Sequence, residues 1–421
     1  MLIRALGTLS LFSIMLAAQE PASVARKALD AMLAGQYDQF LQLATPEVQK
    51  SLPAPELAKL GATLKTYGAM EQIGEPQVTK SGPNTIVVFP ARFATQNINF
   101  RMIVNSSGLV NGFFQLPGGV NWQRPAYSKP DSFKERAVTL GEDDWKLNGT
   151  LTVPNGAGPF PAVVLVHGSG PNDRDETVGG NKVFKDLAEG LASQGVVVLR
   201  YEKRTQQYRV KMMALARYTA DEEVVDDAVA AVTLLRGQPE VNGAKIYVLG
   251  HSLGGYMAPR IAAQAGKVAG IILMAAGARH LEDLLVEQAT AMGLTGQQME
   301  TAKAIQARVK KLEATDEDAP RVGGVPASYW LDLKEYDPVI EAKKLAVPAL
   351  ILQGERDQQV PPANFALWKA GLGSGKGVVT KSYPALNHLF GTNTGKTMQE
   401  EYAKPGHVAP EVIADIAQFV K

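Results

Sequence analysis

A serine between two glycines is the first feature of this sequence that could do chemistry. The stretch "KIYVLGHSLGG" is an apolar run that ends in Gly250, His251, Ser252, Leu253 and Gly254, and it fits G-x-S-x-G at the junction of a strand and a helix. Glycines are needed there because the two backbones crowd each other, while a strained turn, costing about 1–3 kcal/mol, exposes the hydroxyl. The pattern predicts Ser252 as a nucleophile, although a glycine-rich turn without chemistry has the same sequence features.

A serine hydroxyl becomes a useful nucleophile only when a base removes its proton and an acid orients that base. The expected chain order is serine, acid, histidine. "PALILQGERDQQVPP" places Asp357 just after a buried run, and "YPALNHLFG" places His388 in the loop after the following strand. We therefore predict Asp357 as the acid and His388 as the base, with Glu355 and Asp337 as rival acids that position favours less.

The remaining four histidines are expected to have other roles. His167 ends a strand and should pack under a loop, and His251 should point away from the Ser252 side chain. His280 and His407 fall where a solvated or packing role is expected. Because no pair of histidines has metal-ligand spacing and the chain has no cysteine, the sequence predicts no metal site.

The oxyanion that forms during attack needs backbone donors. In "HGSGPNDRDE" a strand stops at His167, and glycines let the backbone curl so that an N–H can face the nucleophile. We assign the two donors to the backbone N–H groups of Ser169 and Leu253. The charged run at 173–176 that follows could shape the entrance of the site, or it could be a solvated loop.

The elements that must position these residues follow one pattern beyond Phe133. Short, nearly continuous β-branched runs such as "FPAVVLVHG", "GVVVLRY" and "VAGIILM" alternate with helix-length segments. Such runs indicate strands covered on both faces, hence a mostly parallel sheet flanked by helices. Ligands of these sheets bind at the carboxyl ends of the strands, where the candidate residues fall. The fold class is α/β, with an insertion at 281–337 expected to form a helical cap.

The first part of the chain has a different pattern. From Pro21 to about Leu64 apolar residues recur at helical spacing, and after Gly68 the period changes to two in "TIVVFPARF", "INFRMIVN" and "LVNGFFQL". Helices followed by antiparallel strands predict a small α+β domain over residues 19–120. The stretch "PGGVNWQRPAYSKPDS" carries Gly and Pro without periodicity and ends this domain. We expect a linker at 121–135 and the catalytic domain at 136–421.

Composition and the N-terminus restrict the class of protein. The 421 residues carry 43 Lys and Arg against 42 Asp and Glu, so nothing favours nucleic acid or an anionic membrane surface as a partner. "MLIRALGTLSLFSIMLAA" has one cation, a short apolar run and small residues, the order of a signal peptide over 1–18. We expect a secreted or periplasmic bacterial protein without stable membrane insertion, although a buried N-terminal helix is an alternative.

Four motifs, "HGSG", "GHSLGG", "GERDQQVPP" and "NHLF", resemble those of the α/β-hydrolase superfamily. The stretch from "HGSGPNDRDE" to "VVVLRYEKRT" is similar to bacterial serine carboxylesterases that carry a small extra N-terminal domain, with Glu202 where relatives often have Asp. The resemblance implies hydrolysis of a small-molecule carboxylic ester, with Ser252 as nucleophile, His388 as base and Asp357 as the orienting acid. It implies no cofactor.

Substrate choice is expected to depend on the cap insertion. Leu281, Leu284, Leu285, Ala289 and Met292 lie at helical spacing and could cover a small acyl group, or could only pack the cap on the body. Three functions remain open from the sequence. They are a serine carboxylesterase, a peptidase or amidase with the same triad, and a binding protein built on a hydrolase scaffold. A peptidase would need a carboxylate or another anchor in the cap for the substrate amine.

Overall fold

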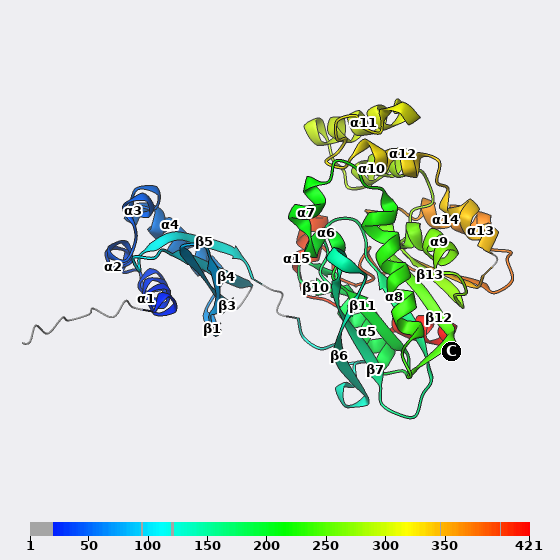
Figure 1. Ribbon diagram of the computed structural model, residues 1–421, viewed down its shortest axis with the longest axis horizontal. Helices are drawn as coiled ribbons and strands as arrows, with labels where there is room; N and C mark the ends of the chain where they lie inside the picture. Colours follow the sequence, from blue (N-terminus) through cyan, green and yellow to red (C-terminus); the bar gives the residue numbers. More distant parts are fainter. Residues whose placement is uncertain (1–19, 94–95, 119–121, 346, 396) are drawn as a thin grey trace, which may run out of the picture. The chain divides into compact units, whose positions relative to one another are not determined.

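The computed structural model describes residues 20–93, 96–118, 122–345, 347–395 and 397–421. The predicted signal peptide lies outside the described residues. The chain divides into two compact units after Asn121 (Figure 1). Within the described ranges, no helix combines the length and the apolar character that crossing a bilayer would require.

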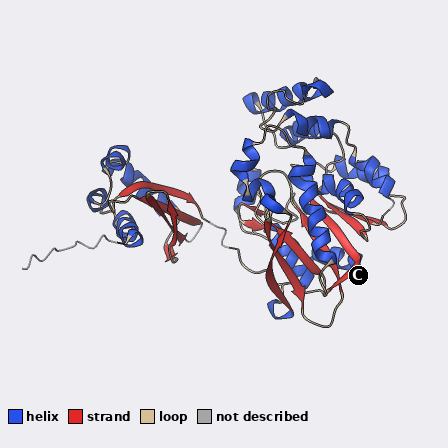
Figure 2. Ribbon diagram, in the orientation of Figure 1, coloured by secondary structure: helices blue, strands red, loops and turns tan. Residues whose placement is uncertain are grey.

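The smaller unit has four helices followed by an antiparallel sheet (Figure 2). The helices are α1 (Pro21–Leu33), α2 (Tyr37–Gln42), α3 (Pro46–Ser51) and α4 (Ala54–Thr66). The strands are β1 (Met70–Ile73), β2 (Gln77–Ser81), β3 (Asn84–Phe93), β4 (Asn97–Val104) and β5 (Val110–Pro117). The sheet order is β1-β3-β4-β5, and β2 also pairs with β3.

The core of the smaller unit lies between the helices and one face of this sheet. Along β3 and β4 buried and half-buried residues alternate, as the period of two predicts for strands with one covered face. Phe89 and Phe100 are fully buried in this core together with Leu29 and Met32 of α1. The sequence pattern therefore located both the helices and the main strands of this unit.

The larger unit contains an eight-stranded sheet in the order β15-β14-β13-β12-β8-β11-β7-β6. The six strands from β15 to β11 run parallel, and β7 and β6 add antiparallel pairs at one edge. The strands are β6 (Phe133–Leu140), β7 (Leu147–Pro154), β8 (Phe160–Val166), β11 (Val197–Tyr201), β12 (Val241–His251), β13 (Gly270–Met274), β14 (Ala349–Gly354) and β15 (Val378–Tyr383). The predicted mostly parallel sheet is confirmed.

Helices cover both faces of the larger sheet (Figure 2). One apolar layer joins the sheet to α8 (Asp226–Arg236), α9 (Leu253–Ala265) and α14 (Ala363–Leu372), with α13 (Pro338–Leu345) alongside. The other layer joins it to α5 (Val183–Ala192) and α16 (Pro410–Val420). Shorter elements are β9 (Thr177–Val178), β10 (Asn181–Lys182), α6 (Arg204–Gln207), α7 (Arg209–Ala214), a π-helical turn η3 (Asp221–Val225) and α15 (Met398–Ala403), with 3₁₀ turns η1 (Pro130–Ser132) and η2 (Asp143–Trp145).

The described residues of the expected linker at 121–135 belong to the larger unit by their contacts. Trp122 Nε1 donates to Asp186 at 2.7 Å, and Arg124 Nε donates to Glu189 at 2.6 Å. The Tyr127 hydroxyl donates to the carbonyl of residue 408 at 2.9 Å. Side chains that follow residue 121 are thus held by α5 and by the segment that precedes α16, and β6 begins at Phe133, inside the expected linker.

Three helices and a 3₁₀ turn fill the insertion between β13 and α13. They are α10 (Leu281–Ala291), α11 (Gly296–Lys310), η4 (Ala314–Asp316) and α12 (Ala327–Lys334). A small apolar cluster that includes Val309, Leu312 and Trp330 holds the insertion together. The expected helical cap is present, and it lies beside α9 at the carboxyl ends of the parallel strands (Figure 1).

Candidate active site

Ser252 occupies the turn between β12 and α9 with φ 55° and ψ −116°. Left-handed φ is rare for a residue with a side chain and is strained. The crowding that requires glycine is visible on both sides. A Cβ at Gly250 would lie 2.1 Å from the backbone of Gly254, and one at Gly254 would lie 2.1 Å from the carbonyl oxygen of Val166. The sequence therefore forces a sharp turn that presents the hydroxyl at the cavity described below.

Asp357 and His388 are joined by a short, buried hydrogen bond. His388 Nδ1 lies 2.7 Å from Asp357 Oδ2, and both residues are at most 4% exposed. Because a carboxylate oxygen only accepts, Nδ1 carries the proton and Nε2 is left as a proton acceptor. The backbone N–H groups of Gln359 and Val360 each donate to Asp357 Oδ1 at 2.8 Å, so the carboxylate is held by its own turn.

His388 lies next to the elbow, the sharp turn at residues 250–254 that presents Ser252. Its ring centroid lies 4.7 Å from that of His251, the residue that precedes Ser252. Among the hydrogen bonds of the described residues, none joins the Ser252 hydroxyl to the His388 ring. Such catalytic hydrogen bonds are often long in unliganded enzymes and shorten when substrate binds.

The two rival acids are engaged elsewhere. Glu355 accepts a hydrogen bond from Ser382 Oγ at 2.7 Å on the exposed side of β15. Asp337 accepts from the backbone N–H groups of Val339 and Ile340 at 2.9 Å and thereby caps α13. Neither carboxylate bonds to His388.

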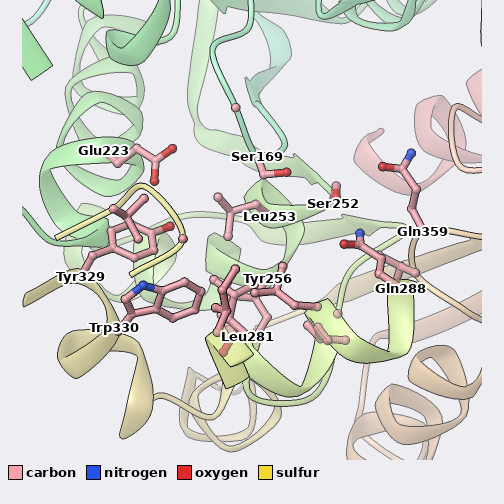
Figure 3. A pocket seen from close by; sticks show the side chains of 18 residues that line it. Ser169, Glu223, Ser252, Leu253, Tyr256, Leu281, Gln288, Tyr329, Trp330 and Gln359 are labelled. Atoms are coloured by element: carbon pink, nitrogen blue, oxygen red, sulfur yellow. The ribbon is translucent and has the colours of Figure 1, made fainter. Parts of the chain in front are cut away.

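The backbone N–H groups of Ser169 and Leu253 are free of other protein partners within the described part of the chain. Leu253 is the first residue of α9, where N–H groups lack an intrahelical acceptor. The loop that contains Ser169 lies against the nucleophile, since a Cβ at Gly168 would be 3.2 Å from Ser252 Cβ. Ser169, Ser252 and Leu253 all line one cavity (Figure 3).

The charged run at 173–176 is neither an entrance nor a solvated loop. Asp175 forms ion pairs with Lys182 at 2.7 Å and Arg200 at 3.0 Å, and Arg174 pairs with Glu202 at 2.7 Å. Each partner comes from a segment distant in the sequence or across a turn. The run is a structural network behind the loop, and this corrects both interpretations made from the sequence.

Glu176 and His251 form a buried ion pair that sequence reasoning missed. Glu176 Oε2 lies 2.9 Å from His251 Nδ1, in a contact not aligned as a linear hydrogen bond, and His251 Nε2 lies 2.9 Å from the carbonyl oxygen of His388. Burial would lower the pKa of His251 and raise that of Glu176. Their mutual attraction outweighs burial, so the pKa of His251 is raised and that of Glu176 is lowered. The pair therefore links the elbow to the His388 loop.

A second buried pair, Lys203 with Glu223, was also missed. Lys203 Nζ lies 2.7 Å from Glu223 Oε1, and Lys203 is 2% exposed. Glu223 belongs to the π-helical turn before α8 and lines the same cavity as Ser252. A lysine two residues after a buried strand is the signal that could have pointed to such a pair.

The other histidines behave as expected or have local roles. His167 is fully buried against the rings of Phe184 and Tyr201, and burial lowers its pKa to about 4. His280 is exposed, and His407 pairs with Asp186 at 3.2 Å. In the described residues no group of three or more His, Cys, Asp or Glu side chains could hold a metal ion.

The cavity beside Ser252 has a volume of about 280 Å³, and half of the residues that line it belong to the cap. Leu281, Leu284 and Leu285 of the predicted apolar stripe line it, whereas Ala289 and Met292 do not. Tyr329 and Trp330 of α12 form the far wall, next to Glu223 (Figure 3). The stripe therefore serves both as a cavity wall and as packing for the cap.

The sequence itself matches a known family. A family model described as serine aminopeptidase, S33, matches residues 158–392, which include Ser252, Asp357 and His388. The chain belongs to this α/β-hydrolase family. Esterase EstD of Thermotoga maritima is 36% identical over 389 residues, which cover 91% of each chain. The predicted membership of the α/β-hydrolases is confirmed.

Solved structures of more distant proteins are also similar. Est1E from Butyrivibrio proteoclasticus is 18% identical, with a TM-score of 0.45 over 68% of this chain and 98% of its own. The Pyrococcus furiosus esterase Pf2001 is 16% identical, with a TM-score of 0.43 over 72% of this chain and 97% of its own. The family assignment does not depend on these two structures.

Proposed function

We propose that the protein is a serine carboxylesterase with Ser252 as nucleophile, His388 as general base and Asp357 as the orienting acid. The observation that carries the proposal is the strained Ser252 elbow at a cavity that also contains two free backbone donors. The His388–Asp357 hydrogen bond supplies a base in the required tautomer. The name of the relative at 36% identity, an esterase, supports the same reaction.

The reaction follows from these groups. Ser252 Oγ attacks the ester carbonyl while His388 Nε2 takes its proton, and the N–H groups of Ser169 and Leu253 bind the resulting oxyanion. The protonated ring then gives its proton to the leaving alcohol, and an acyl-enzyme remains. Water, activated by the same ring, releases the acid. Asp357 stabilises the imidazolium in both steps.

The cavity favours short acyl chains. Its volume of about 280 Å³ is at the lower end of the roughly 300–1,000 Å³ that is usual for small-molecule sites. Its walls from the cap are mostly leucine and aromatic side chains, which suit an alkyl or small aryl group. We infer a preference for esters of about two to six acyl carbons. Each CH₂ group of the acyl chain that the cavity buries should contribute about 0.8 kcal/mol to binding.

The family description, a serine aminopeptidase, makes amide hydrolysis the alternative. An aminopeptidase needs an uncompensated carboxylate for the substrate ammonium group. Glu223 is the one acidic side chain on the described cavity wall, but Lys203 lies 2.7 Å from it. Because Lys203 cancels its charge, Glu223 is a poor anchor for an amine, and we favour the ester.

We further propose that the protein is exported, as its first 18 residues suggest.

The proposed esterase function is tested with p-nitrophenyl acetate, butyrate and decanoate against aminoacyl p-nitroanilides, with Ser252→Ala as the blank. We expect the highest kcat/KM on acetate or butyrate. Faster turnover of the anilides would contradict the proposal.

A further inference from the structure

Both polar groups of the Gly168 backbone are bound by buried charged side chains. Its N–H donates to Glu176 Oε1 at 2.7 Å, and its carbonyl oxygen accepts from Lys203 Nζ at 2.9 Å. The carbonyl also accepts from Asn172 Nδ2 at 3.1 Å. Gly168 therefore cannot supply an oxyanion donor itself, but its N–H and its carbonyl oxygen are both held in place beside Ser252.

The carbonyl of Gly168 and the N–H of Ser169 belong to one planar, trans peptide group, so they point in opposite directions. A side chain that holds the carbonyl on one side therefore aims the N–H to the other side. Lys203 lies on the carbonyl side, and the Ser169 N–H is the group left without a protein acceptor. We propose that Lys203 is a positioning residue that orients the Ser169 N–H of the oxyanion hole.

Glu223 is what permits an ammonium group to sit at this position. A lysine that is 2% exposed would lose several kcal/mol in desolvation without a counter-charge. Glu223 Oε1 at 2.7 Å supplies that charge. The backbone N–H of Lys203 also donates to the carbonyl of Asn172 at 3.1 Å, so the loop is bound to residue 203 at two points.

The alternative is that the pair only stabilises the fold, and the next residue provides a matched control. Arg204 is 7% exposed and forms a two-point ion pair with the buried Asp227. It therefore resembles Lys203 in position, burial and pairing. No hydrogen bond of its described side chain reaches the loop at 168–172, so the same kind of damage is made without disturbing Ser169.

The test compares Lys203→Met with Arg204→Met on p-nitrophenyl butyrate and on a trifluoromethyl ketone, whose adduct with serine places an oxyanion in the hole. We expect Lys203→Met to lower kcat by about 10- to 100-fold, since losing one such donor costs about 10²–10³. KM should change by less than about threefold, and inhibitor affinity should fall in parallel with kcat/KM. Arg204→Met should keep kcat within about threefold. Equal effects of the two variants on kcat, or an unchanged inhibitor affinity in Lys203→Met, would overturn the inference.

Two further variants keep the test decisive if Lys203→Met does not fold. Lys203→Arg preserves a donor and the charge, and kcat should stay within about tenfold of the wild type. Glu223→Gln removes only the counter-charge, and kcat should fall while the protein stays folded; an unchanged kcat and inhibitor affinity would count against the inference. Because the inference rests on the proposed function, fluorophosphonate labelling of the wild type at Ser252 is measured first. Absent labelling refutes the function, whereas normal labelling with matching effects at 203 and 204 refutes only the role of Lys203.

Discussion

The ring of His388 is held through Nδ1 by Asp357 Oδ2 at 2.7 Å, with both side chains almost completely buried. This contact fixes which ring nitrogen can take a proton. In the proposed triad, this contact matters more for the tautomer of His388 than for the stability of the fold.

Asp357→Asn is therefore expected to lower kcat by about 10⁴, because an amide can donate to Nδ1 and stabilise the wrong tautomer. Its volume is unchanged, so circular dichroism and the melting temperature should stay close to those of the wild type. Glu355→Gln, in the same turn, is the control and should keep full activity. Loss of activity in Glu355→Gln with activity retained in Asp357→Asn would reverse the assignment.

The elbow glycines should be intolerant of a single methyl group. A Cβ at Gly254 would lie 2.1 Å from the carbonyl oxygen of Val166, whereas one at Gly243 meets no atom within 4 Å. We expect Gly254→Ala to yield protein that is insoluble or less stable by more than about 3 kcal/mol, as overpacking against backbone predicts. Gly243→Ala should change the free energy of unfolding by less than about 1 kcal/mol. Urea denaturation of both variants makes the comparison.

Breaking the Glu176–His251 pair should cost much of the stability of the larger unit. Removing one member of a buried pair typically costs about 3–5 kcal/mol, so Glu176→Gln should lower the free energy of unfolding by that amount at pH 7. The pKa of Glu176 is lowered in the fold, so this stabilisation exists above about pH 4.3 and is lost as pH falls through the folded value. The difference between wild type and Glu176→Gln should shrink below pH 4.

Glu202→Gln is the control for that measurement. It removes a carboxylate from the more exposed pair with Arg174, which should contribute about 1 kcal/mol or less. If Glu202→Gln and Glu176→Gln lowered the free energy of unfolding equally, the buried pair would contribute no more to stability than the exposed pair.

His167 should make the protein sensitive to mild acid. Burial lowers its pKa to about 4 from an unfolded value of about 6.5. A lowered pKa means that the unfolded chain binds a proton first, so stability is lost as pH falls from about 6.5 to 4, by up to ~3 kcal/mol. His167→Phe should flatten the dependence of the unfolding free energy on pH over this interval. A slope unchanged from the wild type would contradict the assignment.

The cap leucines should determine acyl length. Leu285 of α10 lines the cavity. Met292, which directly follows α10 and belongs to the same apolar stripe, does not line it. Leu285→Trp is expected to lower kcat/KM for p-nitrophenyl butyrate by about tenfold relative to acetate, because the indole fills the space for the longer chain. Met292→Trp should leave the ratio unchanged. If both variants shift the ratio equally, the cavity is not the acyl site.

Much of the larger unit could be predicted because its parallel strands are continuous apolar runs. Among the strands of the eight-stranded sheet, β6 and β7 at the antiparallel edge escaped prediction. Half of the side chains of β6 are exposed and polar, with Glu135 and Arg136 among them, so no apolar run marks the strand. Edge strands carry such residues because one side of them faces water.

The candidate residues at strand ends could be predicted because their order in the chain is informative. The buried ion pairs around them could not be predicted. Glu176 and His251 are 75 positions apart, and nothing local to either residue indicates that the fold buries them together. The ion pairs of the run at 173–176 were not predicted for the same reason, since the cations that pair with Asp175 come from β10 and β11. Ion pairs between distant segments need the fold before they can be assigned.

Covalent trapping of Ser252 tests the central claim most directly. The folded protein is incubated with a fluorophosphonate, its intact mass is measured, and the modified peptide is sequenced by mass spectrometry beside Ser252→Ala. We predict one adduct per chain on Ser252, formed in proportion to the loss of esterase activity, and no adduct in Ser252→Ala. Inactivation with the adduct on another serine, or full activity in Ser252→Ala, would contradict the account.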